Sequence, residues 1–299
     1  MAPSPLRVPT HAASPGSNGF LRFWQKSYGP DWFGLLLIII GYIILLVSEP
    51  FHRMFSLDDR RIQFPHAEME RVPLSMLFFY SLALPFVVIA LFTVLSHRKS
   101  ERKWHYLHVS LLGLFISLMF TSFLTDLVKN GVGRARPDLI ARCKPKEDTP
   151  PDALVTYLVC TETDHHTLHD GFRSFPSGHS SFSFAGLGYL SLFLFGQLHA
   201  GHRGADLGRF LLALLPTVGA VAIAISRVED YRHDVYDVTA GGILGTSIAI
   251  FSYRKYFPSL LSSYAHQPYP SRTSDHRGEG DGFEALQSPD LELGELSPF

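Results

Sequence analysis

The residues best suited to chemistry lie in one short stretch, residues 226–238, which reads SRVEDYRHDVYDV. His233 and Asp237 are four residues apart, so they share one face if a helix begins there. A carboxylate on one imidazole nitrogen fixes the tautomer and leaves the other nitrogen free to act as a nucleophile. Arg227 adds a cation, and a guanidinium group suits an anionic ligand. The spacing therefore predicts a nucleophilic histidine beside an anion site.

The remaining polar residues of this stretch are expected to take no part in the chemistry. We interpret the other charged residues as solvated loop charges or partners in local salt bridges: Glu229, Asp230, Arg232 and Asp234. Tyr231 and Tyr236 are aromatic residues of the kind found at a membrane–water interface. The chemistry of this stretch is thus assigned to His233, Asp237 and Arg227 alone.

Two further clusters have residue types that suit a phosphate group. In PSGHSS, Ser177 is expected to cap a helix, and Gly178 lets the backbone approach a ligand closely. Free N–H groups at such a helix N-terminus favour an anion, to which His179 can donate a proton. In KNGVGRARP, Lys129 and Arg136 supply two cations, and the fork of Arg136 matches phosphate oxygens. Taken singly, each cluster is also typical of a capped helix or of interfacial side chains that extend toward water.

The elements that position these clusters are expected to be membrane helices. The chain of 299 residues is 46% hydrophobic, and its charged fraction of 18% lies below the roughly 25% of soluble domains. Its net charge of −1 gives no overall field that would favour nucleic acid. Six apolar segments approach the roughly 20 residues that cross a bilayer, and they cover about 32–48, 73–96, 106–127, 180–198, 208–226 and 235–253. We therefore predict an all-α polytopic membrane protein, with a kink at Pro85 in the second segment.

The charge of one short connection sets the expected topology. The loop HRKSERKWH between the second and third segments is rich in Lys and Arg, so the positive-inside rule places it in the cytosol. With six membrane helices both chain termini are then cytosolic, and the loops after the third and fifth helices share the opposite side. Those two loops hold all three clusters, which are therefore expected to converge at one membrane face. Three cations, a helix N-terminus and two histidines suit phosphoryl transfer without a metal.

The spacing of the three clusters resembles the three-part signature of the type 2 phosphatidic acid phosphatase superfamily. The matching positions are Lys129, six residues and Arg136-Pro137; Pro176-Ser177-Gly178-His179; and Ser226-Arg227, five residues, His233, three residues and Asp237. The resemblance covers about residues 33–255. It is greatest to the lipid phosphate phosphatase branch, particularly the fungal diacylglycerol pyrophosphate phosphatases, whose loop after the first helix is similar to FSLDDRRIQFPHAEMERVP.

The resemblance implies a role for each matching residue. His233 would be the nucleophile that forms a phosphohistidine, Asp237 would orient it, and His179 would protonate the leaving lipid oxygen. The phosphate would be bound by Lys129, Arg136, Ser177, Gly178 and Arg227. No metal and no other cofactor is expected. The implied activity removes phosphate from diacylglycerol pyrophosphate, phosphatidate and lysophosphatidate at the lumenal or extracytoplasmic face of an endomembrane (vacuole, Golgi or endoplasmic reticulum) or of the plasma membrane.

Other functions share parts of this signature. Polyisoprenyl pyrophosphate phosphatases and glucose-6-phosphatase have similar motifs and differ in their pockets and loops. Vanadium haloperoxidases share the anion site but are soluble, and six apolar segments argue against them. A non-catalytic lipid-phosphate binding protein or transporter is expected to lose His179, His233 or Asp237, and this chain has all three.

The rest of the chain is expected to frame this domain. Residues 31–256 form the predicted membrane phosphatase domain, between disordered cytosolic segments at 1–30 and 257–299 that are poor in large apolar residues. Cys143 and Cys160 fall in one predicted loop, where they form either a disulfide worth about 3 kcal/mol or two free thiols. Neither cysteine has the spacing of a metal site. The sequence leaves the oligomeric state open.

Overall fold

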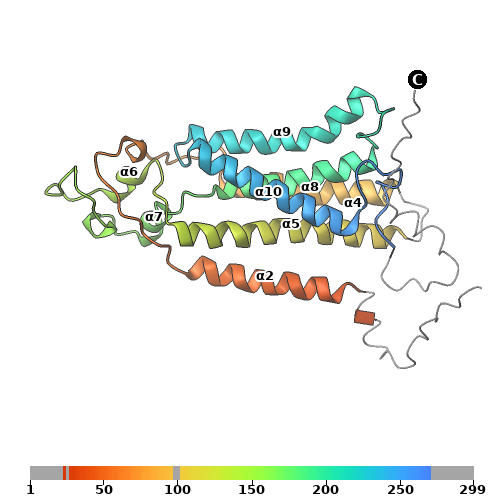
Figure 1. Ribbon diagram of the computed structural model, residues 1–299, viewed down its shortest axis with the longest axis horizontal. Helices are drawn as coiled ribbons and strands as arrows, with labels where there is room; N and C mark the ends of the chain where they lie inside the picture. The colour runs from red at the N-terminus through yellow and green to blue at the C-terminus, as the bar shows by residue number, and fades with distance from the viewer. Residues whose placement is uncertain (1–22, 25–26, 97–101, 271–299) are drawn as a thin grey trace, which may run out of the picture. The chain divides into compact units, whose positions relative to one another are not determined.

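The computed structural model describes three stretches of the chain, which are residues 23–24, 27–96 and 102–270. Figure 1 shows these stretches as a coloured ribbon. Two of the predictions concern residues that lie mostly outside them. These are the disordered segments at 1–30 and 257–299 and the basic connection that includes residues 97–101.

The chain divides into a large unit, residues 34–269, and a second unit formed by residues 1–33 and 270–299. Every predicted site residue belongs to the large unit. Throughout the described residues the regular elements are helices, which confirms the predicted all-α class, and extended pairing is limited there to two isolated bridges. Mostly helical backbone is expected for segments in lipid, where each segment must satisfy its own hydrogen bonds.

Five helices in the described part of the chain are long and apolar enough to cross a membrane. They are α2 (Gly29–Val47), the continuous α3–η2–α4 (Leu74–Phe78, Phe79–Ala83 and Leu84–Ser96), α5 (Lys103–Val132), α9 (Leu207–Glu229) and α10 (Val235–Tyr256). Their exposed surface is rich in Leu, Ile, Val and Phe side chains. Such an exposed apolar surface fits a lipid environment. These helices correspond to five of the six predicted membrane segments.

The remaining predicted segment forms α8 (Gly178–Gln197), which is not among those five. This helix packs against α5, α9 and α10, and most of its residues are buried. Its sequence is rich in glycine and serine, because neighbouring helices rather than lipid cover it. A side chain at Gly186 would collide with the Ser81 backbone, and one at Gly245 with the backbone of Ser181 and Ala185. The small residues thus allow close helix contacts around α8.

The helix that contains Pro85 is irregular just before that proline. Residues Phe79–Ala83 form the π-helical turn η2, between α3 and α4. Proline lacks a backbone N–H and its ring clashes with the preceding turn, so a wider turn is one way to accommodate it. The kink predicted at Pro85 is therefore seen as a local change of helix type.

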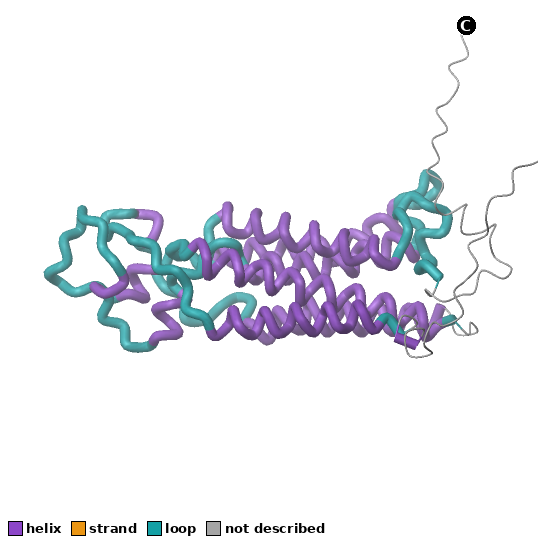
Figure 2. Tube along the Cα trace, turned by 60° about the horizontal axis from the view of Figure 1, so that its bottom comes forward, coloured by secondary structure: helices purple, strands orange, loops and turns teal. Residues whose placement is uncertain are grey.

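Two loops gather at one end of the helices, and we call them the cap. The cap consists of residues 48–73, with the short helix η1 (Arg60–Ile62), and residues 133–177. The second loop contains α6 (Leu139–Cys143), η3 (Tyr157–Val159) and α7 (His165–Asp170). Figure 2 shows both loops together at the same end of the long helices. The cap therefore covers the end at which α5 finishes and α8 begins.

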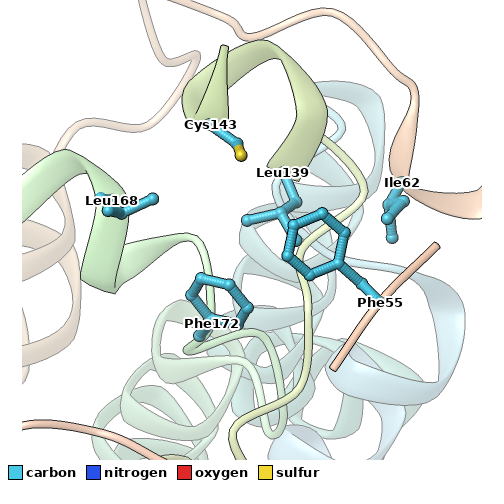
Figure 3. Close-up of a cluster of buried hydrophobic side chains, with 6 residues drawn as sticks. All are labelled: Phe55, Ile62, Leu139, Cys143, Leu168 and Phe172. Atoms are coloured by element: carbon cyan, nitrogen blue, oxygen red, sulfur yellow. The ribbon is translucent and has the colours of Figure 1, made fainter. Parts of the chain in front are cut away.

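The cap has a small core of its own (Figure 3). That core is built from Phe55, Ile62, Leu139, Cys143, Leu168 and Phe172. Cys143 is bonded to Cys160, so the two cysteines form the disulfide rather than two free thiols. Phe55 and Val155 exchange backbone hydrogen bonds of 3.0 and 2.8 Å, which join the two loops. The two loops are thus one packed unit rather than separate excursions.

Candidate active site

The first cluster is positioned by the end of α5. Gly133 adopts a left-handed conformation, with φ of +58°, and its N–H donates to the Lys129 carbonyl at 3.1 Å. This glycine ends the helix and returns the chain over the bundle. Lys129, one turn earlier, is buried, and its Nζ donates to the Arg173 carbonyl at 2.7 Å. The ammonium group is thereby held against the second loop of the cap.

Arg136 is fixed by a carboxylate of the cap. Its Nε donates to the Asp170 carbonyl at 2.8 Å, and its NH2 donates to Asp170 Oδ1 at 2.7 Å. Burial opposes the charged form of Asp170, but the Arg136 and Arg142 cations outweigh it and hold the pKa of Asp170 well below its usual range. The aspartate is therefore ionised at neutral pH. It orients the guanidinium of Arg136 from the side of α7.

The second cluster forms the start of α8. Ser177 is its N-cap, and the Ser177 hydroxyl accepts from the Ser180 N–H at 3.4 Å. Gly178 lies beside the first cluster, because a Cβ placed there would contact Lys129 Cε at 3.5 Å. The Nε2 atom of His179 lies 3.1 Å from the Val72 carbonyl oxygen. The cap predicted at Ser177 is confirmed, and the helix N-terminus is next to the Lys129 side chain.

The third cluster is positioned by a capping box at the start of α10. Asp234 caps the helix, and the Asp234 and Asp237 side chains each accept the backbone N–H of the other. His233 Nδ1 lies 3.6 Å from Asp237 Oδ2, too far for a hydrogen bond. This Nδ1 atom is buried and finds no hydrogen-bond partner within the described ranges. His233 and Asp237 are therefore adjacent, as predicted, but they do not form the expected hydrogen bond.

The environment of His233 favours a neutral ring. Burial lowers the pKa of His233 well below its ordinary value, and the positive charges of Arg136 and Lys129 lower it further. A neutral imidazole has a lone pair available on one nitrogen. The positive charges of the first cluster therefore act on a residue of the third.

Two residues that the sequence analysis passed over hold Asp237 in place. Arg134 NH1 donates to Asp237 Oδ1 at 2.8 Å and also pairs with Asp234. Ser174 Oγ donates to Asp237 Oδ2 at 2.5 Å. Both belong to the cap, whereas Asp237 belongs to α10. Arg134 stands inside the quoted stretch KNGVGRARP, so its charge was the available signal, while Ser174 gave none.

The surroundings of Arg227 decide whether the charged residues next to it are solvated or form salt bridges. Arg227 is 1% exposed, and it donates to Asp230 Oδ2 at 2.6 Å and to Glu70 Oε2 at 2.8 Å. Asp230 also accepts from the backbone N–H and the side chain of Arg71, at 3.0 and 2.7 Å. Asp230 is buried and pairs locally with Arg227, which confirms the salt-bridge alternative for this residue, whereas Arg232 is buried and pairs with the distant Glu70, so neither is a solvated loop charge. The reason is the first cap loop, which covers them.

Further contacts bring the three clusters together. Arg136 NH1 lies 3.5 Å from the Arg232 carbonyl oxygen, which joins the first cluster to the third. The Ser177 N–H donates to the Asp237 carbonyl at 2.9 Å, which joins the second cluster to the third. The result is a site with three predicted cations, a helix N-terminus and two histidines. Such a site can bind a tetrahedral anion and transfer it to a ring nitrogen.

An apolar cavity adjoins this site. It has a volume of about 210 Å³ and lies among α2, α3, α5 and α8. Its lining includes Gly178, His179, Leu77, Phe78, Met119 and Phe182. Among the described residues, the site included, no group of three or more His, Cys, Asp or Glu side chains could hold a metal ion.

Comparison with known proteins gives a consistent set of relatives. Residues 110–260, which contain all three clusters, match the PAP2 superfamily. Over 240 residues the chain is 44% identical to diacylglycerol pyrophosphate phosphatase 1 of Saccharomyces cerevisiae, covering 80% of this chain and 82% of that protein. It is 41% identical to the probable diacylglycerol pyrophosphate phosphatase 1 of Schizosaccharomyces pombe, with coverage of 80% and 84%. It is 35% identical to lipid phosphate phosphatase 2 of Arabidopsis thaliana, with coverage of 76% and 77%. No solved structure matches the chain.

Proposed function

The chain belongs to the PAP2 superfamily, and we propose that it is a membrane-embedded lipid phosphate phosphatase that works through a phosphohistidine. The observation that carries this proposal is the meeting of Lys129 and Arg136 with a buried His233, whose pKa they lower and whose backbone N–H donates to the Arg227 carbonyl at 3.2 Å. Cations around the transferred group stabilise charge that develops during phosphoryl transfer. The proposed substrates are diacylglycerol pyrophosphate, phosphatidate and lysophosphatidate; the first appears in the name of the Saccharomyces cerevisiae relative, and the name of the Arabidopsis thaliana relative refers to lipid phosphates in general.

The proposed reaction has two steps. A lone pair on the His233 ring attacks phosphorus, an N–P bond forms, and the P–O bond to the lipid breaks. His179 gives its proton to the departing oxygen. Water then attacks the phosphohistidine, the N–P bond breaks, and the proton of that water returns to His179. Asp237 orients the His233 ring across the 3.6 Å gap, while the Ser177 hydroxyl and the Gly178 amide help to bind the phosphate.

The placement in the membrane follows the same proposal. Six membrane helices, with α8 as the helix surrounded by the others, put both termini in the cytosol and the cap on the lumenal or extracytoplasmic side. The disulfide between Cys143 and Cys160 supports that side, because disulfides persist in oxidising compartments. The apolar cavity beside His179 suits the chains of a substrate that stays in the bilayer. No magnesium takes part in the proposed reaction.

The test is phosphate release from diacylglycerol pyrophosphate and phosphatidate in detergent micelles with excess EDTA. The wild type is compared with His233→Ala and with His166→Ala, which changes an exposed histidine of the cap. We expect metal-free activity in the wild type and in His166→Ala, and none in His233→Ala. Activity that survives in His233→Ala contradicts the phosphohistidine. A wild type that hydrolyses neither lipid points instead to polyisoprenyl pyrophosphates.

A further inference from the structure

Arg232 is a buried arginine that lies outside the signature positions. It directly precedes His233 in the chain, it is 9% exposed, and its carbonyl oxygen contacts Arg136. Its NH2 group forms an ion pair with Glu70 Oε1 at 3.0 Å and donates to the Ala67 carbonyl at 3.1 Å. Its Nε is buried and has no hydrogen-bond partner in the described part of the chain. A buried guanidinium with an unused N–H can bind a further anion.

Glu70 links this arginine to the phosphate-binding residues. Its Oε1 forms an ion pair with Arg232, and its Oε2 accepts a hydrogen bond from Arg227 at 2.8 Å. The same Oε2 lies 3.8 Å from His179 Nε2. A carboxylate held between two guanidinium groups uses the donors that phosphate oxygens also prefer. A phosphate group at this place would therefore compete with Glu70 for Arg232 and Arg227.

The neighbouring histidine indicates which phosphate group this would be. His179 is the proposed acid, so the space beside it is on the leaving-group side of the transferred phosphorus. In a phosphate monoester the leaving group is a neutral alcohol. In a pyrophosphate the leaving group is a second phosphate, which carries negative charge as it departs. An additional cation that shares the Glu70 carboxylate with His179 thus has a partner in pyrophosphate substrates only.

Resting on the proposed function, we propose that Arg232 binds the leaving phosphate of pyrophosphate substrates and that Glu70 competes with that phosphate for Arg232. When His233 attacks the terminal phosphorus, the N–P bond forms and the bond from that phosphorus to the bridging oxygen breaks. The electron pair stays on the bridging oxygen, which departs as part of a phosphate monoester. Arg232 stabilises that charge. Arg232 and Glu70 together set the preference between pyrophosphate and monoester.

The experiment measures kcat/KM for diacylglycerol pyrophosphate and for phosphatidate in the same micelles with EDTA. For Arg232→Gln we expect the pyrophosphate value to fall about 30-fold and the phosphatidate value about threefold, since a charge-assisted hydrogen bond is lost only with the pyrophosphate. The ratio of the two values then falls about tenfold. For Glu70→Gln the competing charge is removed, and we expect the same ratio to rise about threefold.

Two further variants keep the test decisive. Arg61→Gln changes an exposed arginine of the same cap loop and should leave the ratio unchanged. Arg232→Lys keeps the charge without the fork and should give an intermediate ratio. If Arg232→Gln loses all activity, the ratio of the two kcat/KM values is taken from Arg232→Lys instead. Equal losses on both lipids in Arg232→Lys, or an unchanged ratio in Arg232→Gln, overturn the role of Arg232. A Glu70→Gln ratio equal to that of the wild type overturns the competition. A wild type that hydrolyses neither lipid contradicts the proposed function itself.

Discussion

Helix α8 and the cap meet at the same buried site but are stabilised in opposite ways. The packing around α8 relies on close contacts between helices, with glycines such as Gly186 and Gly245 at the points of contact and few charged side chains. The cap depends on a disulfide, a core of a few side chains and buried ion pairs such as Arg136–Asp170. The difference is instructive because α8 supplies His179, the proposed acid, while the cap supplies Arg136 and residues that hold the other charged groups, such as Arg134 beside Asp237.

The largest effect is expected where the two regions touch. In Asp237→Asn the residue of α10 that faces His233 loses its charge, and the Arg134 cation of the cap loses part of its pairing. We expect kcat to fall about 10³-fold, as for other carboxylates that orient a histidine. Steady-state kinetics on phosphatidate measures this. Ser174→Ala removes a single hydrogen bond to Asp237 and should cost far less, about tenfold. Equal losses in the two variants would contradict an electrostatic role for Asp237.

The next effect should separate the cap from the helices. The double variant Cys143→Ser, Cys160→Ser removes a link between residues 17 positions apart, which is worth about 3 kcal/mol. We expect protease cleavage within residues 133–177 to accelerate about 100-fold while the helical circular dichroism of the detergent-solubilised protein is retained. Loss of the helical signal together with the cap would mean that the two regions unfold as one unit.

A smaller effect should come from the ion pair that orients Arg136. Asp170→Asn keeps the backbone bond to Arg136 and removes the charged one. We expect KM for phosphatidate to rise about tenfold with little change in kcat, because a charge-assisted contact to the binding residue is lost. Asp148→Asn, an exposed cap carboxylate, is the matched control and should behave as the wild type. A fall in kcat without a change in KM would argue against this role.

The smallest effect is expected for the dependence of folding stability on pH, and its sign follows from the lowered pKa of His233. Burial and nearby cations lower the pKa of His233 in the folded protein, so the unfolded chain binds the proton first as the pH falls. The folded state is therefore destabilised progressively below about pH 6.5, by at most about 1.4 kcal/mol per pH unit for this one group. Melting temperatures in detergent between pH 8 and pH 5 measure it. His233→Ala should show a shallower decline, and an identical decline would exclude His233 as the cause.

The two regions also differ in how far the sequence predicts them. The capped start of α8 at Ser177 and the His233–Asp237 spacing are readable because both are local patterns of three or four residues. The long helices are readable because their apolar runs are continuous. The partners of the charged groups cannot be predicted from local patterns, because they come from distant parts of the chain. Glu70 and Arg227, for example, are 157 residues apart. Only folding of the first cap loop over α9 shows that Asp230 and Arg232 are buried rather than solvated.

The division of the cap into two separate stretches has a consequence for biosynthesis. Residues 48–73 emerge from the ribosome well before residues 133–177, so Phe55 has no Val155 to pair with until α5 has been made. The binding groups of Lys129 and Arg136 come next, and His233 and Asp237 arrive only with the last long helix. A chain interrupted at the end of α9 would already carry both cap loops but no nucleophile. The protein therefore acquires its catalytic capacity at the final insertion step, after most of its membrane-embedded mass is in place.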